Sequence, residues 1–165
     1  MGLIAFMKEA GEKLFGRGEA KAAQDAAAAA PTPANVDAAN AAAAGAIRTY
    51  IETMGLSCQD LGVKFDGNYV TVSGCAPDQS TKEKIILSAG NVSGVLGVYD
   101  DMTVAAAEPE ATYYTVVRGD TLSKIAKEQY GDASKYPAIF EANKPMLSHP
   151  DKIYPGQVLR IPPAA

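Results

Sequence analysis

The chain has 165 residues and a formal net charge of −4, which is enough length for one ordinary domain or two small ones. The acidic balance and the lack of a basic cluster argue against a nucleic-acid-binding surface, and no apolar run is long enough to span a membrane. Alanine inflates the hydrophobic content of 47%, so the core-forming fraction is smaller than this number suggests.

Residues 1–15 predict a short amphipathic helix. Its apolar face follows from the helical spacing of Leu3, Phe6, Met7, Ala10 and Leu14. Gly11 is expected to end or bend this helix. A membrane-surface helix is the weaker alternative, because the charged residues of this stretch form no basic face.

The same stretch has no basic region followed by a long apolar run, so we expect no secretory signal and a cytoplasmic protein. Thiols are usually reduced in the cytosol. We therefore expect Cys58 and Cys75 to be free thiols, and their spacing does not predict a metal site. A disulfide is the alternative, because the predicted hairpin would place both cysteines near its open end.

Residues 16–34 are rich in alanine and end in two prolines. Alanine favours helix, but this segment has no apolar face to bury. We predict a tether that is partly helical or disordered.

Residues 35–104 predict a small α+β domain with the order α-β-β-α-β. Asn35 is expected to cap the first helix, and Gly55 to follow its end. Alternating apolar residues around a tight turn at 66–68 predict a hairpin. Asp78 or Ser80 would begin the second helix, and the last strand would cover residues 96–104.

Residues 84–95, KIILSAGNVSGV, predict the end of this second helix followed by a loop with two glycines. Gly90 stands where a helix C′ residue is expected. The last carbonyls of a helix lack intrahelical partners and carry the negative end of its dipole. Because the loop contains no carboxylate, His or Cys, any ligand should be a weakly hydrated monovalent cation bound by backbone oxygens. An ordinary turn whose carbonyls face water is the alternative.

A strand of the form GNYVTVSG and a helix ending in SAGNVSGV resemble the BON domain. The resemblance covers about residues 36–104. It implies the association with membrane or envelope binding that is general among BON domains.

Residues 105–112, AAAEPEAT, predict a linker, and residues 113–163 predict a second domain with the order β-α-α-β. Its first strand should cover 114–117 and its last strand 158–161. Asp120 or Thr121 would cap the helix between them. The segments YTVVRGDTLSKIA, IFEANKPML and IYPGQVLRIP closely resemble a LysM module.

The LysM resemblance implies a shallow groove that binds glycans containing N-acetylglucosamine. The first loop of this groove would contribute Gly119, Asp120, Thr121 and Leu122. The opposite loop would contribute Ile153 and Tyr154, together with Asn143, Lys144 and Met146. Asp120 and Thr121 also suit a helix cap, and Tyr154 also suits a turn, so these structural roles remain alternatives.

The whole chain resembles the small bacterial BON–LysM potassium-binding proteins, through AGEKL near the start and IFEANKPML and PDKIYPGQVLRIP near the end. This resemblance implies a monomeric ion sensor that binds K⁺ and larger alkali cations in preference to Na⁺ and changes conformation. It implies that backbone carbonyls hold the ion, and these belong to Met7, Ala10, Glu12, Gly90, Val92 and Val95.

An ion that binds only when both segments are in place would favour the assembled state. Closure of LysM against BON, with the linker as hinge, would be one readout. An enzyme is not expected, because the single His149 has no catalytic partner arrangement. The main alternative is an envelope-associated module that binds peptidoglycan through LysM, and another is an adaptor whose LysM surface recognises a protein.

Overall fold

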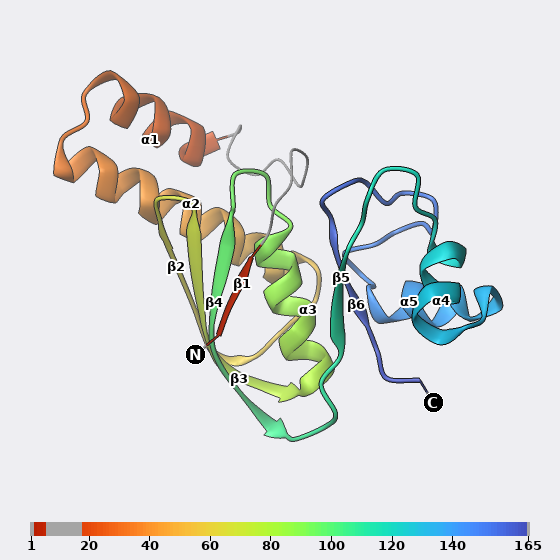
Figure 1. Cartoon of the computed structure of the whole chain (residues 1–165). Helices are drawn as coiled ribbons and strands as arrows, with labels where there is room; N and C mark the ends of the chain where they lie inside the picture. The colour runs from red at the N-terminus through yellow and green to blue at the C-terminus, as the bar shows by residue number, and fades with distance from the viewer. Residues whose placement is uncertain (1, 6–17, 165) are drawn as a thin grey trace.

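The computed structural model of the chain describes residues 2–5 and 18–164, which form two small α+β domains (Figure 1). The first domain contains a four-stranded sheet and three helices. The second contains a two-stranded sheet and its own short helices, and it lies beside the third helix of the first domain. The predicted fold class is therefore confirmed.

The first domain contains β1 (Gly2–Ala5), α1 (Gly18–Ala29), α2 (Pro33–Thr53), β2 (Gln59–Asp66), β3 (Tyr69–Asp78), α3 (Gln79–Gly90) and β4 (Gly97–Ala106). The strand order is β1-β4-β3-β2. Strands β3 and β4 are parallel because α3 crosses over between them, whereas the other pairs are antiparallel.

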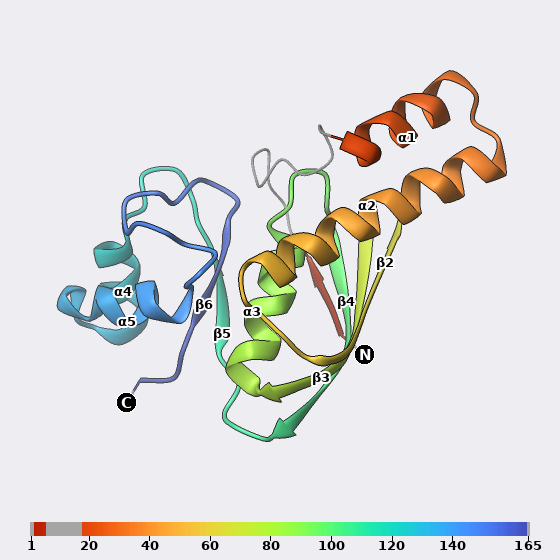
Figure 2. The ribbon, with the colours of Figure 1, turned by 180° about the vertical axis from the view of Figure 1, so that it is seen from behind.

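The core of this domain lies between its sheet and the helices α2 and α3, which are next to each other in Figure 2. Ile47 and Ile51 of α2 and Ile85 of α3 are fully buried there. They pack with inward-facing residues of the strands, such as Val72. Val158, which belongs to the second domain, is part of the same cluster, so the two domains share one apolar interface.

The second domain contains β5 (Thr112–Thr115), α4 (Leu122–Tyr130), the 3₁₀-helix η1 (Ala133–Lys135), α5 (Tyr136–Ala142) and β6 (Val158–Ile161). Strands β5 and β6 are antiparallel. Leu122, Ile125 and Ala126 of α4 are buried in the core of this domain. Thr121 rather than Asp120 is the N-cap, because its side chain accepts a hydrogen bond from the Lys124 N–H.

The described part of the N-terminus differs from the predicted helix. Residues Gly2–Ala5 form strand β1, in which Leu3 pairs with Tyr99 of β4. A short apolar run does not distinguish strand from helix by periodicity, and the edge of β4 supplies backbone partners that the sequence pattern does not reveal. The rest of the predicted helix, residues 6–15, lies outside the described residues.

The alanine-rich segment is helical over Gly18–Ala29, and α1 lies alongside α2 (Figure 1). The N-cap of α2 is Thr32 rather than the predicted Asn35. Pro33 then takes the first helical position, where proline is favoured because its missing N–H costs no hydrogen bond. Gly55 follows the end of α2 with a φ of +73°, as predicted.

Candidate functional site

The loop between α3 and β4 begins one residue later than the sequence pattern predicts. Gly90 is the last residue of α3, and Asn91 is the C-cap with a φ of −80°. The Asn91 N–H donates to the Leu87 carbonyl over 2.9 Å. Gly90 is therefore not a left-handed C′ residue, and its carbonyl belongs to the last turn of α3, where the helix dipole is negative.

Residues 92–95 form a tight turn in which the Val95 N–H donates to the Val92 carbonyl over 3.1 Å. Gly94 occupies the third position with a φ of +95°, which favours glycine. The side chains of Val92 and Val95 are 0% and 1% exposed and pack in the core. Any ligand contact from these two valines must therefore come from the main chain.

Two asparagines hold this loop from opposite sides. On one side, the Asn68 carboxamide in the β2–β3 hairpin donates to the Gly94 carbonyl over 2.8 Å, and the Leu96 N–H donates to the Asn68 carbonyl. On the other side, the Asn91 carboxamide bonds to both backbone groups of Val158. The loop conformation is therefore fixed by the hairpin and by strand β6.

Gly90 ends α3, and Val92 and Val95 lie in the loop that follows it. The Val92 carbonyl already accepts the turn hydrogen bond, but a carbonyl oxygen has two lone pairs and can also contact a cation. The other three predicted ligands, Met7, Ala10 and Glu12, lie outside the described residues. Whether they meet the loop therefore stays a prediction.

Strand β1 points toward the loop. It runs antiparallel to β4, and its last residue, Ala5, pairs with Gly97. Gly97 lies two residues beyond Val95 in the chain. Strand β1 therefore runs toward the end of β4 that adjoins Val95, which is the direction that a site shared by the N-terminal segment and the loop requires.

The described residues contain no cluster of three or more His, Cys, Asp or Glu side chains that could hold a metal ion. A multivalent cation such as Ca²⁺ would require several carboxylate ligands. The chemistry available at the loop is instead that of neutral carbonyl dipoles.

The predicted glycan-binding residues of the second domain divide into exposed and buried positions. Gly119 and Thr121 are exposed, whereas Leu122 is 3% exposed and belongs to the core. Ile153 and Tyr154 are half-buried, and the Tyr154 hydroxyl donates to the Asn91 carbonyl over 3.5 Å. Tyr154 thus contacts the loop of the first domain.

Asp120 stabilises the first LysM-like loop. Its buried carboxylate accepts hydrogen bonds from the Tyr114 hydroxyl, the Val117 N–H and the Lys124 ammonium group. Burial favours a higher pKa, but these three donors outweigh it and lower the pKa of Asp120. Burial is the main cause that raises the pKa of Tyr114 to about 12, and the hydrogen bond from its hydroxyl to Asp120 adds to this increase. Asp120 therefore has a clear structural role, and its glycan-binding role stays a prediction.

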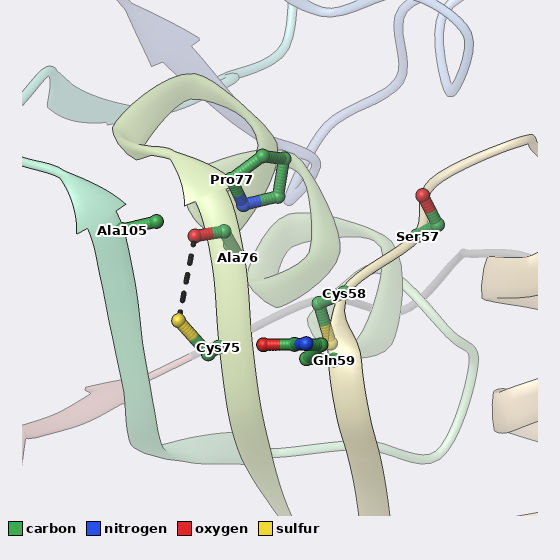
Figure 3. Close-up of a pocket in the computed structure, with 7 residues that line it drawn as sticks. All are labelled: Ser57, Cys58, Gln59, Cys75, Ala76, Pro77 and Ala105. Atoms are coloured by element: carbon green, nitrogen blue, oxygen red, sulfur yellow. Dashed lines mark hydrogen bonds between the residues drawn. The ribbon is translucent and has the colours of Figure 1, made fainter.

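A cavity of about 460 Å³ lies at the end of the sheet opposite the α3–β4 loop, and both cysteines line it (Figure 3). Cys75 lies on β3, and Cys58 lies just before β2. Both are free thiols, as predicted. Burial is the main cause that raises the pKa of Cys58, followed by the proximity of Cys75.

Three residues that join the domains were not predicted from the sequence, namely Glu83, Asn91 and Arg160. Glu83 and Arg160 form a buried ion pair between α3 and β6. Arg160 looked like one polar residue of a final strand, and Asn91 looked like a loop residue. The one sequence feature that could have indicated a contact between the domains is a charged residue within an apolar strand, as Arg160 is within β6.

None of the helices within residues 18–164 is both long and apolar enough to cross a membrane.

Comparison with protein families gives two matches. The BON domain model matches residues 39–106, and the LysM domain model matches residues 114–162. These ranges agree with the two structural units described above.

Three curated relatives illustrate how far the similarity extends. The potassium binding protein Kbp of Escherichia coli O6:H1 is 40% identical over 163 residues, which cover 98% of this chain and 99% of that protein. An uncharacterized protein of Deinococcus radiodurans is 36% identical over 118 residues, or 65% of this chain and 46% of that protein. Esterase Rv1288 of Mycobacterium tuberculosis is 53% identical over 53 residues, or 32% of this chain and 11% of that protein. This chain spans less than half the length of the latter two proteins.

Proposed function

Because this chain belongs to the same family as the potassium binding protein Kbp, we propose that it binds K⁺ through backbone carbonyls of the α3–β4 loop and the N-terminal segment. The proposed ligands are the carbonyls of Met7, Ala10, Glu12, Gly90, Val92 and Val95. The protein is proposed to be a cytoplasmic, monomeric ion sensor rather than an enzyme.

The observation that carries this proposal is the direction in which β1 ends. Ala5 pairs with Gly97, so β1 runs toward the end of β4 that adjoins Val95. Only a few residues separate Ala5 from Met7 and Ala10. This register supports a site in which a short N-terminal segment meets a loop that is about 80 residues away in sequence.

The donor chemistry supports a monovalent cation. Neutral carbonyls have a weaker field than carboxylates, so they compete poorly with water for the strongly hydrated Na⁺ and better for K⁺ and larger alkali cations. The last turn of α3 adds the negative end of its dipole. Val92 and Val95 bury their side chains in the core, so packing fixes the positions from which their carbonyls are presented.

A conformational change would follow from the shared site. An ion that contacts both segments binds only the assembled arrangement, and it favours that arrangement by its differential affinity. Docking of the N-terminal segment is the step that we propose to vary. The structure gives less support to a hinge that includes Ala111, because this residue is buried and its N–H donates to Glu83 over 2.9 Å.

Titration of the dialysed, ion-free protein with K⁺ tests the proposal, with Na⁺ at equal ionic strength as control. Calorimetry would measure binding, and small-angle scattering would measure the change in shape. Saturable binding with compaction in K⁺ but not in Na⁺ is expected. The absence of heat and of any shape change in both salts would refute the proposal.

A glycan site in the LysM domain is the second candidate function, and the match over residues 114–162 is the observation that favours it. The exposed Gly119 and Thr121 lie in the first loop of the implied groove. Co-sedimentation of the full chain with insoluble peptidoglycan tests this function, and it does so independently of the potassium titration.

A further inference from the structure

The outer edge of β6 is paired with two asparagine side chains instead of a third strand. The Asn91 carboxamide accepts from the Val158 N–H over 2.9 Å and donates to the Val158 carbonyl over 2.8 Å. The Asn143 carboxamide makes the same two contacts with Arg160, over 2.7 and 2.8 Å. A carboxamide carries one donor and one acceptor side by side, so each asparagine pairs with a strand residue as a neighbouring strand would.

These two asparagines come from different domains. Asn91 is the C-cap of α3 in the BON domain, whereas Asn143 is the C-cap of α5 in the LysM domain. Both side chains are buried, with residue exposures of 3% and 1%. Because an unpaired backbone group at a buried strand edge is costly, both contacts stabilise β6. Only the Asn91 contact also joins LysM to BON.

The backbone of Asn91 lies between two of the proposed ion ligands. Its N atom belongs to the same planar peptide unit as the Gly90 carbonyl, and its own carbonyl belongs to the unit that leads to Val92. That carbonyl accepts the Tyr154 hydroxyl, so LysM contacts Asn91 through both its side chain and its backbone. Since the Gly90–Asn91 peptide unit is planar, fixing Asn91 restricts the direction of the Gly90 carbonyl, and it also fixes the point from which Val92 begins.

We propose that Asn91 is a positioning residue for the ion site, and that docking of LysM strand β6 onto it sets the orientation of the Gly90 carbonyl and the position of Val92. This inference rests on the proposed function. LysM then acts as a structural part of the potassium site although it contributes no ligand. Coupling of this kind is reciprocal, so K⁺ must also tighten the contact between Asn91 and β6.

Asn91→Ala and Asn143→Ala form a matched pair of variants. Each loses two hydrogen bonds to the backbone of β6, but only Asn91→Ala changes the contact with the ion loop. Potassium titration of the full chain should show an affinity at least tenfold weaker in Asn91→Ala and within twofold of wild type in Asn143→Ala. Tyr154→Phe removes the hydroxyl that contacts the Asn91 carbonyl, and it should weaken potassium affinity by a smaller factor than Asn91→Ala does.

Amide hydrogen exchange of the unmodified protein gives a test that needs no variant. The Val158 N–H bonds to Asn91, and the Arg160 N–H bonds to Asn143. Replacing Na⁺ with K⁺ at constant ionic strength should slow exchange at Val158 more than at Arg160. The Arg160 N–H serves as the internal reference, because it lies on the same strand and its acceptor, Asn143, belongs to its own domain, whereas the Arg160 side chain pairs with Glu83.

The outcomes separate the inference from the function on which it rests. If wild-type protein shows no saturable K⁺ binding, the proposed function fails and the inference fails with it. If wild type binds K⁺ but Asn91→Ala binds equally well, or Asn143→Ala weakens binding as much, the positioning role alone is wrong. Should either variant not fold, equal slowing of exchange at Val158 and Arg160 would overturn the inference.

Discussion

Glu83 of α3 and Arg160 of β6 form an ion pair that is buried between the two domains. Their side chains are only 2% and 9% exposed. Glu83 also accepts hydrogen bonds from the Gln79 side chain over 2.8 Å and from the Ala111 N–H over 2.9 Å. Because several donors satisfy the carboxylate, its charge can be buried. One side chain therefore holds α3, the end of the linker and β6 together.

Arg160→Met should lower the free energy of unfolding by about 3–5 kcal/mol, because it leaves the Glu83 carboxylate buried without its cationic partner. Adding Glu83→Gln to this variant should restore part of the loss, because glutamine is neutral and its oxygen can still accept from Gln79 and Ala111. Urea unfolding of the full chain measures both effects.

The exposed pair Arg48–Glu52 provides the control for this experiment. The Arg48 Nε and Glu52 Oε1 atoms are 3.0 Å apart, but the two side chains are 53% and 54% exposed. Arg48→Met should change the free energy of unfolding by less than about 1 kcal/mol. Equal losses in Arg48→Met and Arg160→Met would contradict a stabilising role for the buried pair.

Gly94→Ala should both destabilise the protein and weaken K⁺ binding. Gly94 has a φ of +95°, and an L-residue in a positive-φ conformation costs about 1–2 kcal/mol. Any relaxation of that strain would shift the carbonyls of the 92–95 turn. Thermal unfolding and potassium titration measure the two effects.

Gly131→Ala is the matched control, because Gly131 has a φ of +73° at the end of α4 and a Cβ there would meet no atom within 4 Å. It should lose similar stability while its potassium affinity stays unchanged. Equal weakening of K⁺ binding in both variants would mean that the effect reports general stability rather than loop geometry.

Asp120→Asn should remove a stabilisation that depends on pH. The pKa of Asp120 is lowered in the folded protein, below the unfolded value of about 3.9. A lowered pKa contributes stability that is fully present above the unfolded value and is lost as the pH falls through the folded value. The difference in unfolding free energy between wild type and variant should therefore be largest near neutral pH and should shrink below about pH 4.

Urea unfolding at a series of pH values measures this difference. Asp151→Asn is the control, because the Asp151 side chain is 89% exposed. A gap between wild type and Asp120→Asn that stays constant from neutral pH to pH 3 would show that the charge of Asp120 is not the source of its effect.

Local signals predicted much of the fold. The bounds of β6 follow from a short apolar run after a Pro-Gly turn. Of the two predicted starts of α3, Asp78 is the N-cap, and its side chain accepts a hydrogen bond from the Thr81 N–H three residues later. These features depend on neighbours in sequence. The family resemblance rested on the same local motifs, so it gave both domains correctly.

Features that depend on distant partners were not predictable. Strand β1 forms because β4, almost 100 residues later, offers an edge for it. Asn91 is buried because Val158 presents unpaired backbone groups, and no local pattern distinguishes such an asparagine from a solvated one. For the ion site, the family resemblance implied which carbonyls could be ligands, but it did not reveal the turn at 92–95 or the hydrogen bonds of Asn68 and Asn91 that hold the loop.

The thiol of Cys58 should react slowly near neutral pH, because the thiolate is the reactive form and the pKa of this group is raised. Burial is the main cause, and the nearby Cys75 adds to it. In a Cys75→Ser variant, the rate of iodoacetamide alkylation, followed by mass spectrometry, should rise with pH and reach its half-maximum at a higher pH than for a free cysteine. Unfolding the same variant in urea should move the half-maximum down to the ordinary value. Limited access to the cavity would lower the plateau rate but would not move the half-maximum, so an unchanged half-maximum on unfolding would rule out the raised pKa.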